Sequence, residues 1–158
     1  ISHRGNLDGP NPEEENTLSY IDKALAEGHE VELDLRVINH QLYLGHDKAQ
    51  HKIMRRDLCE RRHRLWVHCK DNVSFLYCPE CRSFAHSSDP FCFVTPGSHG
   101  PYSGFVWIHD LTLELTRMSV IPLLAKEDID NFDLSRAKDV FGICTDYPSY
   151  LKDKLRDQ

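Results

Sequence analysis

The sequence predicts an α/β fold whose core is a parallel barrel or a barrel-like sheet. Strand-like runs recur along the chain, and segments with helical spacing separate several of them. A complete (β/α)₈ barrel usually needs about 250 residues, whereas this chain has 158. We therefore expect a reduced barrel. No repeat, low-complexity tract or flexible linker marks a boundary, so residues 1–158 are expected to form a single domain.

The first predicted helix spans Thr17–Glu27. Its apolar residues fall at helical spacing, Asn16 suits the N-cap, and Gly28 suits the position just after the last turn. The strand that follows alternates apolar residues with Glu32, Asp34 and Arg36, which indicates one apolar and one polar face.

A hairpin is predicted after this strand, with its turn at Asn39-His40 and its end at Gly45-His46-Asp47. The remaining strands and helices are predicted from shorter apolar runs. Strands are predicted at Leu65–Cys69, Phe91–Thr95, Gly104–Ile108, Val120–Leu124 and Phe141–Cys144. Helices are predicted at about 53–62 and 72–76, with a short one near Ile129 or at 135–139.

The composition excludes several classes of protein. Hydrophobic residues make up 40% and charged residues 28% of the chain, as in ordinary globular domains. No apolar run approaches the roughly 18 residues of a membrane span, and the formal net charge of −6 argues against a nucleic-acid partner. The six cysteines are too scattered for a secreted disulfide framework, which favours a cytoplasmic location; a targeting segment before Ile1 would change that.

Two carboxylates form the first candidate site. Glu32 and Asp34 are two residues apart on a strand, so both side chains project from the same face and can converge on one cation. Such hard oxygen ligands suit Mg²⁺ or Ca²⁺. The alternative is a charged, solvated face of an edge strand.

Two short motifs with histidine add to this site. His3 and Arg4 end the predicted first strand, and His46 and Asp47 end the hairpin. If these strands are parallel neighbours, all four residues lie at the C-terminal rim, where barrel active sites are found. Two imidazoles beside a metal and an arginine could act as acid and base in phosphodiester cleavage. With ten histidines in the chain, however, any chosen pair can be coincidental.

The order of these motifs resembles the signature of the glycerophosphodiester phosphodiesterase family, as a short and divergent member. The matching segments are His3-Arg4-Gly5, Glu15-Asn16-Thr17, Gly28 followed by Glu32-x-Asp34, and Gly45-His46-Asp47. The segment 142–148, Gly-Ile-Cys-Thr-Asp-Tyr-Pro, is similar to the family's last strand.

This resemblance implies a TIM-barrel-like fold and metal-dependent hydrolysis of a small glycerophosphodiester to an alcohol and glycerol phosphate. It assigns His3 and His46 as the general acid and base and Glu32 and Asp34 as metal ligands. It also implies that Arg4 contacts the phosphate. Supporting positions are Glu15, Asn16 and Asp47.

The sequence departs from the family at one expected metal ligand. A third carboxylate followed two residues later by lysine is expected, but the best match keeps Lys70, a phosphate contact, and has His68 in place of the carboxylate. Imidazole is a softer ligand and favours Mn²⁺ or Zn²⁺ over Ca²⁺. His68 is therefore a tentative metal ligand, with Mg²⁺ or Ca²⁺ preferred and Mn²⁺ or Zn²⁺ possible for the site.

Three alternatives remain open from the sequence. The chain can be a phosphate-binding pseudoenzyme of the same fold, or a phospholipase that releases a headgroup through a cyclic phosphate. The third is an interaction protein with a zinc knuckle built from Cys78, Cys81, His86 and Cys92. The segment His86–Asp89 and the pair His109-Asp110 are further candidates for the rim.

Overall fold

The structure, a computed structural model, describes residues 1–86, 89–97 and 104–157 and contains two mixed β-sheets. In the larger sheet the order is β4-β3-β2-β5-β6, with β1 paired to β2. Strands β1, β2, β5 and β6 are parallel, and β3 and β4 are added as an antiparallel meander. The strands are β1 (Ser2–His3), β2 (Val31–Ile38), β3 (Gln41–Leu44), β4 (His51–Ile53), β5 (Leu65–Cys69) and β6 (Arg82–Phe84).

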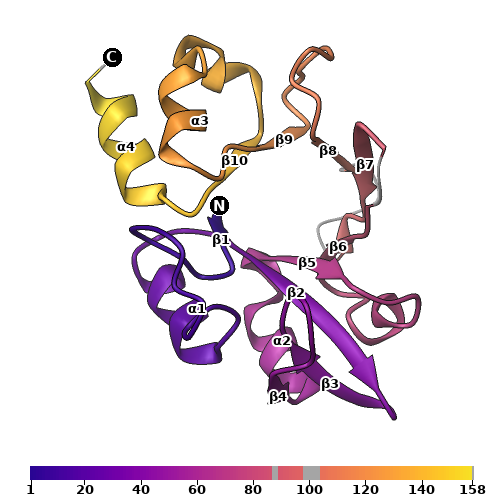
Figure 1. Cartoon of the computed structure of the whole chain (residues 1–158). Helices are drawn as coiled ribbons and strands as arrows, with labels where there is room; N and C mark the ends of the chain where they lie inside the picture. The colour runs from indigo at the N-terminus through magenta and orange to yellow at the C-terminus, as the bar shows by residue number, and fades with distance from the viewer. Residues whose placement is uncertain (87–88, 98–103, 158) are drawn as a thin grey trace.

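The second sheet has the order β10-β9-β8-β7. Its members are β7 (Phe91–Val94), β8 (Phe105–Ile108), β9 (Ser119–Pro122) and β10 (Gly142–Cys144). Strands β8, β9 and β10 are parallel, whereas β7 is antiparallel to β8. Two isolated bridges, Ser2 with Thr145 and Ser83 with Thr95, join the edges of the two sheets, so the first and last strands lie side by side (Figure 1).

The predicted TIM-barrel-like fold is therefore wrong. The strands form two small mixed sheets that meet through isolated bridges rather than continuous ladders, so they do not make one closed parallel barrel, and few helices separate them. Between β5 and β6 the described chain has only a 3₁₀ helix, η2 (Ser74–Tyr77), and β8 reaches β9 through the turn-rich segment 109–118. These connections lack the apolar repeat of a helix long enough to cover a sheet, so a regular β/α alternation cannot form.

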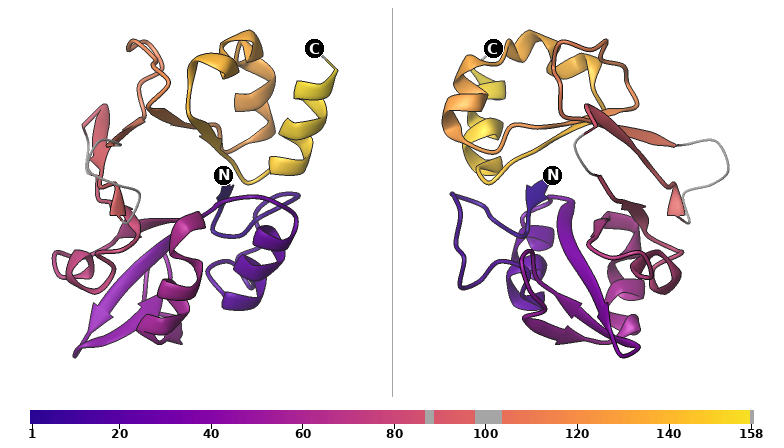
Figure 2. Two further views of the ribbon diagram at one scale, coloured as in Figure 1. Left: turned by 180° about the vertical axis from the view of Figure 1, so that it is seen from behind. Right: turned by 45° about the vertical axis from the view of Figure 1, so that its right-hand side comes forward.

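Helices flank the sheets on their outer sides (Figure 2). They are α1 (Leu18–Ala26), α2 (Arg55–Arg61), α3 (Lys126–Asn131) and α4 (Pro148–Arg156), with 3₁₀ helices η1 (Arg62–Arg64) and η4 (Leu134–Asp139). The prediction for α1 is confirmed, and Gly28 with φ +91° follows its C-cap. Its N-cap is Thr17, whose hydroxyl accepts a hydrogen bond from Tyr20 N at 3.2 Å, and not Asn16.

The apolar core has separate clusters on the two sides of the first sheet, because alternate residues of a strand point to opposite faces. The odd-numbered residues of β2, such as Leu33, pack with Val67 against Ile21 of α1 and Leu58 of α2. Trp66, the neighbour of Val67 on β5, points the opposite way and packs with aromatic residues of the second sheet. A third cluster joins α3 and α4 to the outer side of the second sheet. The space between the two sheets is thus filled partly by apolar side chains and partly by the polar face of β2.

None of the helices in the described part of the chain has the length and apolar content that a bilayer crossing requires.

Replacing Gly45, which precedes His46, with alanine should destabilise the protein. Its φ is +144°, and an added Cβ would lie 2.2 Å from the carbonyl oxygen of Lys48. Gly28 is the control, since its φ of +91° is also unfavourable for alanine but its Cβ would meet nothing within 4 Å. We expect Gly28→Ala to cost about 1–2 kcal/mol and Gly45→Ala clearly more, measured by urea denaturation. Equal losses would contradict this account of the loop.

Candidate active site

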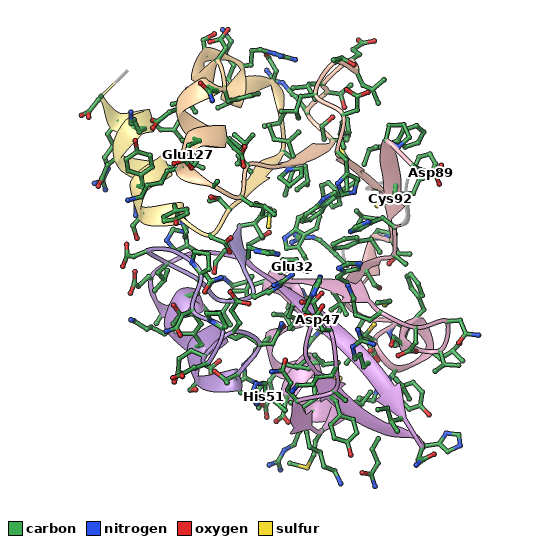
Figure 3. The ribbon with its side chains drawn as sticks, in the orientation of Figure 1. Glu32, Asp47, His51, Asp89, Cys92 and Glu127 are labelled. Atoms are coloured by element: carbon green, nitrogen blue, oxygen red, sulfur yellow. The ribbon has the colours of Figure 1, made fainter. Side chains whose placement is uncertain are left out.

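The pairing of β2 with β5 places the candidate metal ligands next to one another. Strands β2 and β5 pair in parallel with Glu32 beside Trp66 and Asp34 beside His68. Because alternate residues of a strand share a face, Glu32, Asp34 and His68 all point to the inner side of the sheet. Figure 3 shows Glu32 in the middle of the molecule, between the two sheets.

These three residues form a buried group that could hold a metal ion. Each offers one ligand atom, and the three atoms lie within 4.8 Å of one another. Oε2 of Glu32 is buried and accepts no hydrogen bond in the described structure, and Oδ1 of Asp34 accepts no well-aligned one, although Nδ1 of His68 lies 3.2 Å from it. A buried carboxylate oxygen without a partner is energetically costly. A divalent cation would satisfy both atoms, so the residues present fit a metal.

Asp34 is the most heavily contacted carboxylate of the site. Nε of Arg4 lies 3.1 Å from Oδ2, and Nδ1 of His68 lies 3.2 Å and Nζ of Lys70 3.7 Å from Oδ1. Asn16, held with φ +61°, donates to Oδ2 at 3.0 Å and accepts from the Asp34 amide at 2.9 Å. Burial alone would raise the pKa of Asp34, but the contacts with His68, Arg4 and Asn16 outweigh it and lower this pKa. Asp34 is therefore a fixed negative charge.

Glu32 lies in a different electrostatic environment. Burial, followed by the negative charge of Asp34, raises the pKa of Glu32 to about 7, although His3 and Arg4 act in the opposite direction. Without a cation, this carboxyl is partly protonated near neutral pH. A bound metal would favour its ionised form.

The stability of the metal-free protein should report this shift. Because the pKa of Glu32 is raised from 4.5 to about 7 in the folded state, its contribution to stability is complete below pH 4.5 and is lost as pH rises through about 7. Relative to Glu32→Gln, the melting temperature of the wild type should fall between pH 5 and pH 8. Added divalent metal should reverse the fall most strongly above pH 7. A pH-independent difference between the two proteins would contradict the shift.

His3 is held by the far end of the chain. Its Nδ1 lies 2.7 Å from Oδ1 of Asp146, just after β10, and its Nε2 lies 3.8 Å from Oε2 of Glu32. Asn6 donates hydrogen bonds of 2.8 Å to Asp146 and to Glu15. Burial would lower the pKa of His3, but the hydrogen bond to Asp146 and the charges of Glu32 and Asp146 raise it above its ordinary value.

His46 lies at the outer edge of the same site. Its predicted hairpin is confirmed, and both turn residues, Asn39 and His40, have positive φ as a two-residue type I′ turn requires. Arg36 donates to the carbonyl oxygens of Gly45 and His46, which fixes the loop. Nδ1 of His46 lies 2.6 Å from Oδ1 of Asp47, whose side chain is itself 91% exposed.

A cavity of about 250 Å³ unites these side chains. Its polar lining consists of the predicted residues His3, Arg4, Glu32, His46, His68 and Lys70, with His86 and His109. Phe84 and Trp107 form an aromatic wall: the two rings stack at 4.4 Å, and His68 stacks on Phe84 at 4.9 Å. Of the supporting residues, Glu15 lies 3.2 Å from Arg4, Asn16 binds Asp34, and Asp47 contacts His46 only.

Sequence reasoning gave no role to three residues of this site. Asp146, which bonds to His3, belongs to the segment 142–148 that resembles the family's last strand. Its position just after that strand could have indicated a place at the site. Asn6 follows the first motif by one residue, but nothing in its spacing indicates that it binds Asp146. Phe84 is one residue of a strand that includes a buried arginine and was not predicted.

The proposed zinc knuckle does not assemble. Cys78 and Cys81 lie in the core behind β5, whereas Cys92 belongs to the cluster between the sheets and His86 stacks on His68 at 4.5 Å. Among the described residues, only Glu32, Asp34 and His68 have metal-ligand geometry. Ser87 and Ser88, in the predicted rim segment, lie outside the described residues.

No family model, curated protein or solved structure matches the chain. The assignment of a function therefore depends on the site itself and on the order of the sequence motifs.

Proposed function

We propose that this protein is a metal-dependent phosphodiesterase that hydrolyses a glycerophosphodiester to an alcohol and glycerol phosphate. The observation that carries the proposal is a buried Glu32, Asp34 and His68 group, two of whose members line one cavity together with His3, Arg4 and Lys70. The resemblance of the motif order to the glycerophosphodiester phosphodiesterase family supports it.

Two cationic side chains suit the phosphate. Arg4 and Lys70 both line the cavity, and Glu15 and Asp34 hold the Arg4 guanidinium from two sides. Guanidinium groups bind phosphate oxygens through parallel hydrogen bonds, whereas a lysine acts as a single point charge. We expect Arg4 to orient the phosphodiester and Lys70 to add positive charge beside it.

The two histidines suit proton transfer. A carboxylate accepts the Nδ1 proton of each ring, Asp146 for His3 and Asp47 for His46. Nε2 of each ring is then left for the substrate, and that of His3 also lies 3.8 Å from Oε2 of Glu32. A neutral imidazole accepts a proton there, and a charged one donates it. One histidine would take the proton of the attacking water, and the other would give a proton to the leaving alcohol.

Glu32, Asp34 and His68 would hold the divalent ion. When bound, the ion would neutralise charge on the phosphoryl oxygens as a Lewis acid. The two carboxylates favour Mg²⁺ or Ca²⁺, and the imidazole of His68 extends the choice to Mn²⁺ or Zn²⁺. The chain supplies the cavity, the phosphate contacts and the proton-transfer groups.

A second candidate function is phosphate binding without turnover. The observation that favours it is the set of cations already around Asp34, since Arg4, Lys70 and His68 partly neutralise this carboxylate without a metal. Such a pseudoenzyme would bind phosphate esters in a chelator as well as in the presence of divalent ions.

A panel of glycerophosphodiesters, assayed with and without Mg²⁺, Ca²⁺, Mn²⁺ and Zn²⁺, tests the proposal. We expect release of glycerol phosphate only when a metal is present. Phosphorus NMR of the products distinguishes direct hydrolysis from a headgroup-releasing phospholipase, which would pass through a cyclic phosphate. Binding without release under all conditions would support the pseudoenzyme and reject the phosphodiesterase.

A further inference from the structure

A second and larger cavity, of about 650 Å³, lies next to the proposed catalytic cavity. It is formed where β8 and β9 end and where α3 and η4 follow. We call it the side groove. Its apolar lining is provided by Leu111, Pro122, Leu123, Leu124 and Phe132.

The two cavities share part of their walls. His109, Pro122 and Leu124 belong to the wall of both. A substrate whose phosphate lies between Arg4 and Lys70 could therefore extend past His109 into the side groove. The catalytic cavity alone, at about 250 Å³, is smaller than the roughly 300–1,000 Å³ of most ligand sites. The side groove supplies the missing volume.

The polar residues of the side groove leave an apolar surface for an occupant. Asp128 accepts a hydrogen bond from the Ala125 amide at 2.9 Å, and Asp133 accepts from the amide and hydroxyl of Ser135 at 3.1 and 2.7 Å. Both acids thus serve as helix caps. Arg136 has no ion pair within the described residues, and its guanidinium lies 5.8 Å from the Phe132 ring. Asp128 and Asp133 keep their negative charge as caps, and Arg136 offsets one of the two charges, so the apolar lining and not charge selects the occupant.

We propose that the side groove binds the alcohol portion of the phosphodiester and that this portion is an uncharged alkyl chain. The inference rests on the proposed function, because it places the phosphate in the catalytic cavity. Leu124, at 36% exposure, is one of the large apolar side chains that such a chain would cover. Substrates with a small alcohol would leave this surface in water.

Calorimetric titration of the full chain with ethyl, butyl, hexyl and octyl phosphate in the presence of Mn²⁺ tests the inference. These probes share one phosphate group and differ only in chain length. Burial of each added methylene should tighten binding roughly three- to fourfold. The heat capacity of binding should become more negative along the series.

A pair of variants locates the effect. Leu111→Gln, in the side groove, should reduce the gain from hexyl and octyl chains by roughly tenfold. Phe93→Gln is the control, because Phe93 is 75% exposed on β7 and lines neither cavity. Equal affinity along the wild-type series, or an equal loss in both variants, would overturn the inference.

The same titration separates this inference from the proposed function. If ethyl phosphate binds and chain length has no effect, only the alkyl-chain inference is wrong. If neither ethyl phosphate nor inorganic phosphate binds, the phosphodiesterase proposal is wrong, and the inference falls with it.

Discussion

Replacing Asp34 with asparagine is expected to weaken divalent-metal binding by more than ~10² and to reduce phosphodiester turnover to background. Even partners that only orient a metal ligand are worth 10–100-fold in affinity, and Asp34 would itself be a ligand. The substitution also leaves Arg4 and Lys70 without the carboxylate they both contact. Asparagine is preferred to alanine because it preserves volume and can still bond to Asn16.

The measurement is calorimetric titration with Mn²⁺ together with the rate of glycerol phosphate release. Asp153→Asn is the matched control, because Asp153 is an exposed carboxylate on α4 and does not line the catalytic cavity. It should bind metal and turn over substrate like the wild type. Metal binding that survives unchanged in Asp34→Asn would reject the assignment of this residue as a ligand.

Replacing His3 or His46 with alanine should lower turnover by roughly 10²–10⁴ while metal affinity changes little. Both rings line the cavity, but neither belongs to the Glu32, Asp34 and His68 group. Loss of either histidine should therefore lower turnover without lowering metal affinity, whereas Asp34→Asn should lower both. The wild-type rate should also depend on pH as a bell-shaped curve, since one imidazole must start neutral and the other charged.

His63→Ala is the control for this pair, because His63 is exposed on η1 and lies outside the cavity. Its turnover should equal that of the wild type. Asp146→Asn should resemble a partial loss of His3, because the amide can present its NH₂ group to Nδ1 and favour the wrong tautomer. Wild-type rates in both His3→Ala and His46→Ala would disprove the proton-transfer mechanism.

The elements that were predicted correctly are those determined by residues close to one another in the sequence. The helix Leu18–Ala26, the alternating strand with Glu32 and Asp34, and the hairpin turn at Asn39-His40 are each specified by residues within about ten positions. The same-face spacing of Glu32 and Asp34 therefore placed both carboxylates correctly on the inner side of the sheet.

The errors arose where structure depends on distant partners. Strand β6 carries Arg82, which is 6% exposed because it bonds to Glu30 at 2.8 Å and lies 4.6 Å from the Trp66 ring. No local pattern marks a buried arginine as part of a strand. Helix α4 was missed for a different reason, because Pro148 at its first position and Leu151 and Leu155 four residues apart are local helix signals that the prediction did not use. The barrel was predicted by assuming helices in connections that contain turns.

The most direct test of the central claim is the rate of glycerol phosphate release from a glycerophosphodiester by chelator-stripped protein as divalent metal is added back. The account predicts no turnover in the stripped protein and full recovery as the metal site fills, with Glu32→Gln and Asp34→Asn remaining inactive throughout. Turnover that persists without metal, or no turnover with any of Mg²⁺, Ca²⁺, Mn²⁺ and Zn²⁺, would contradict it.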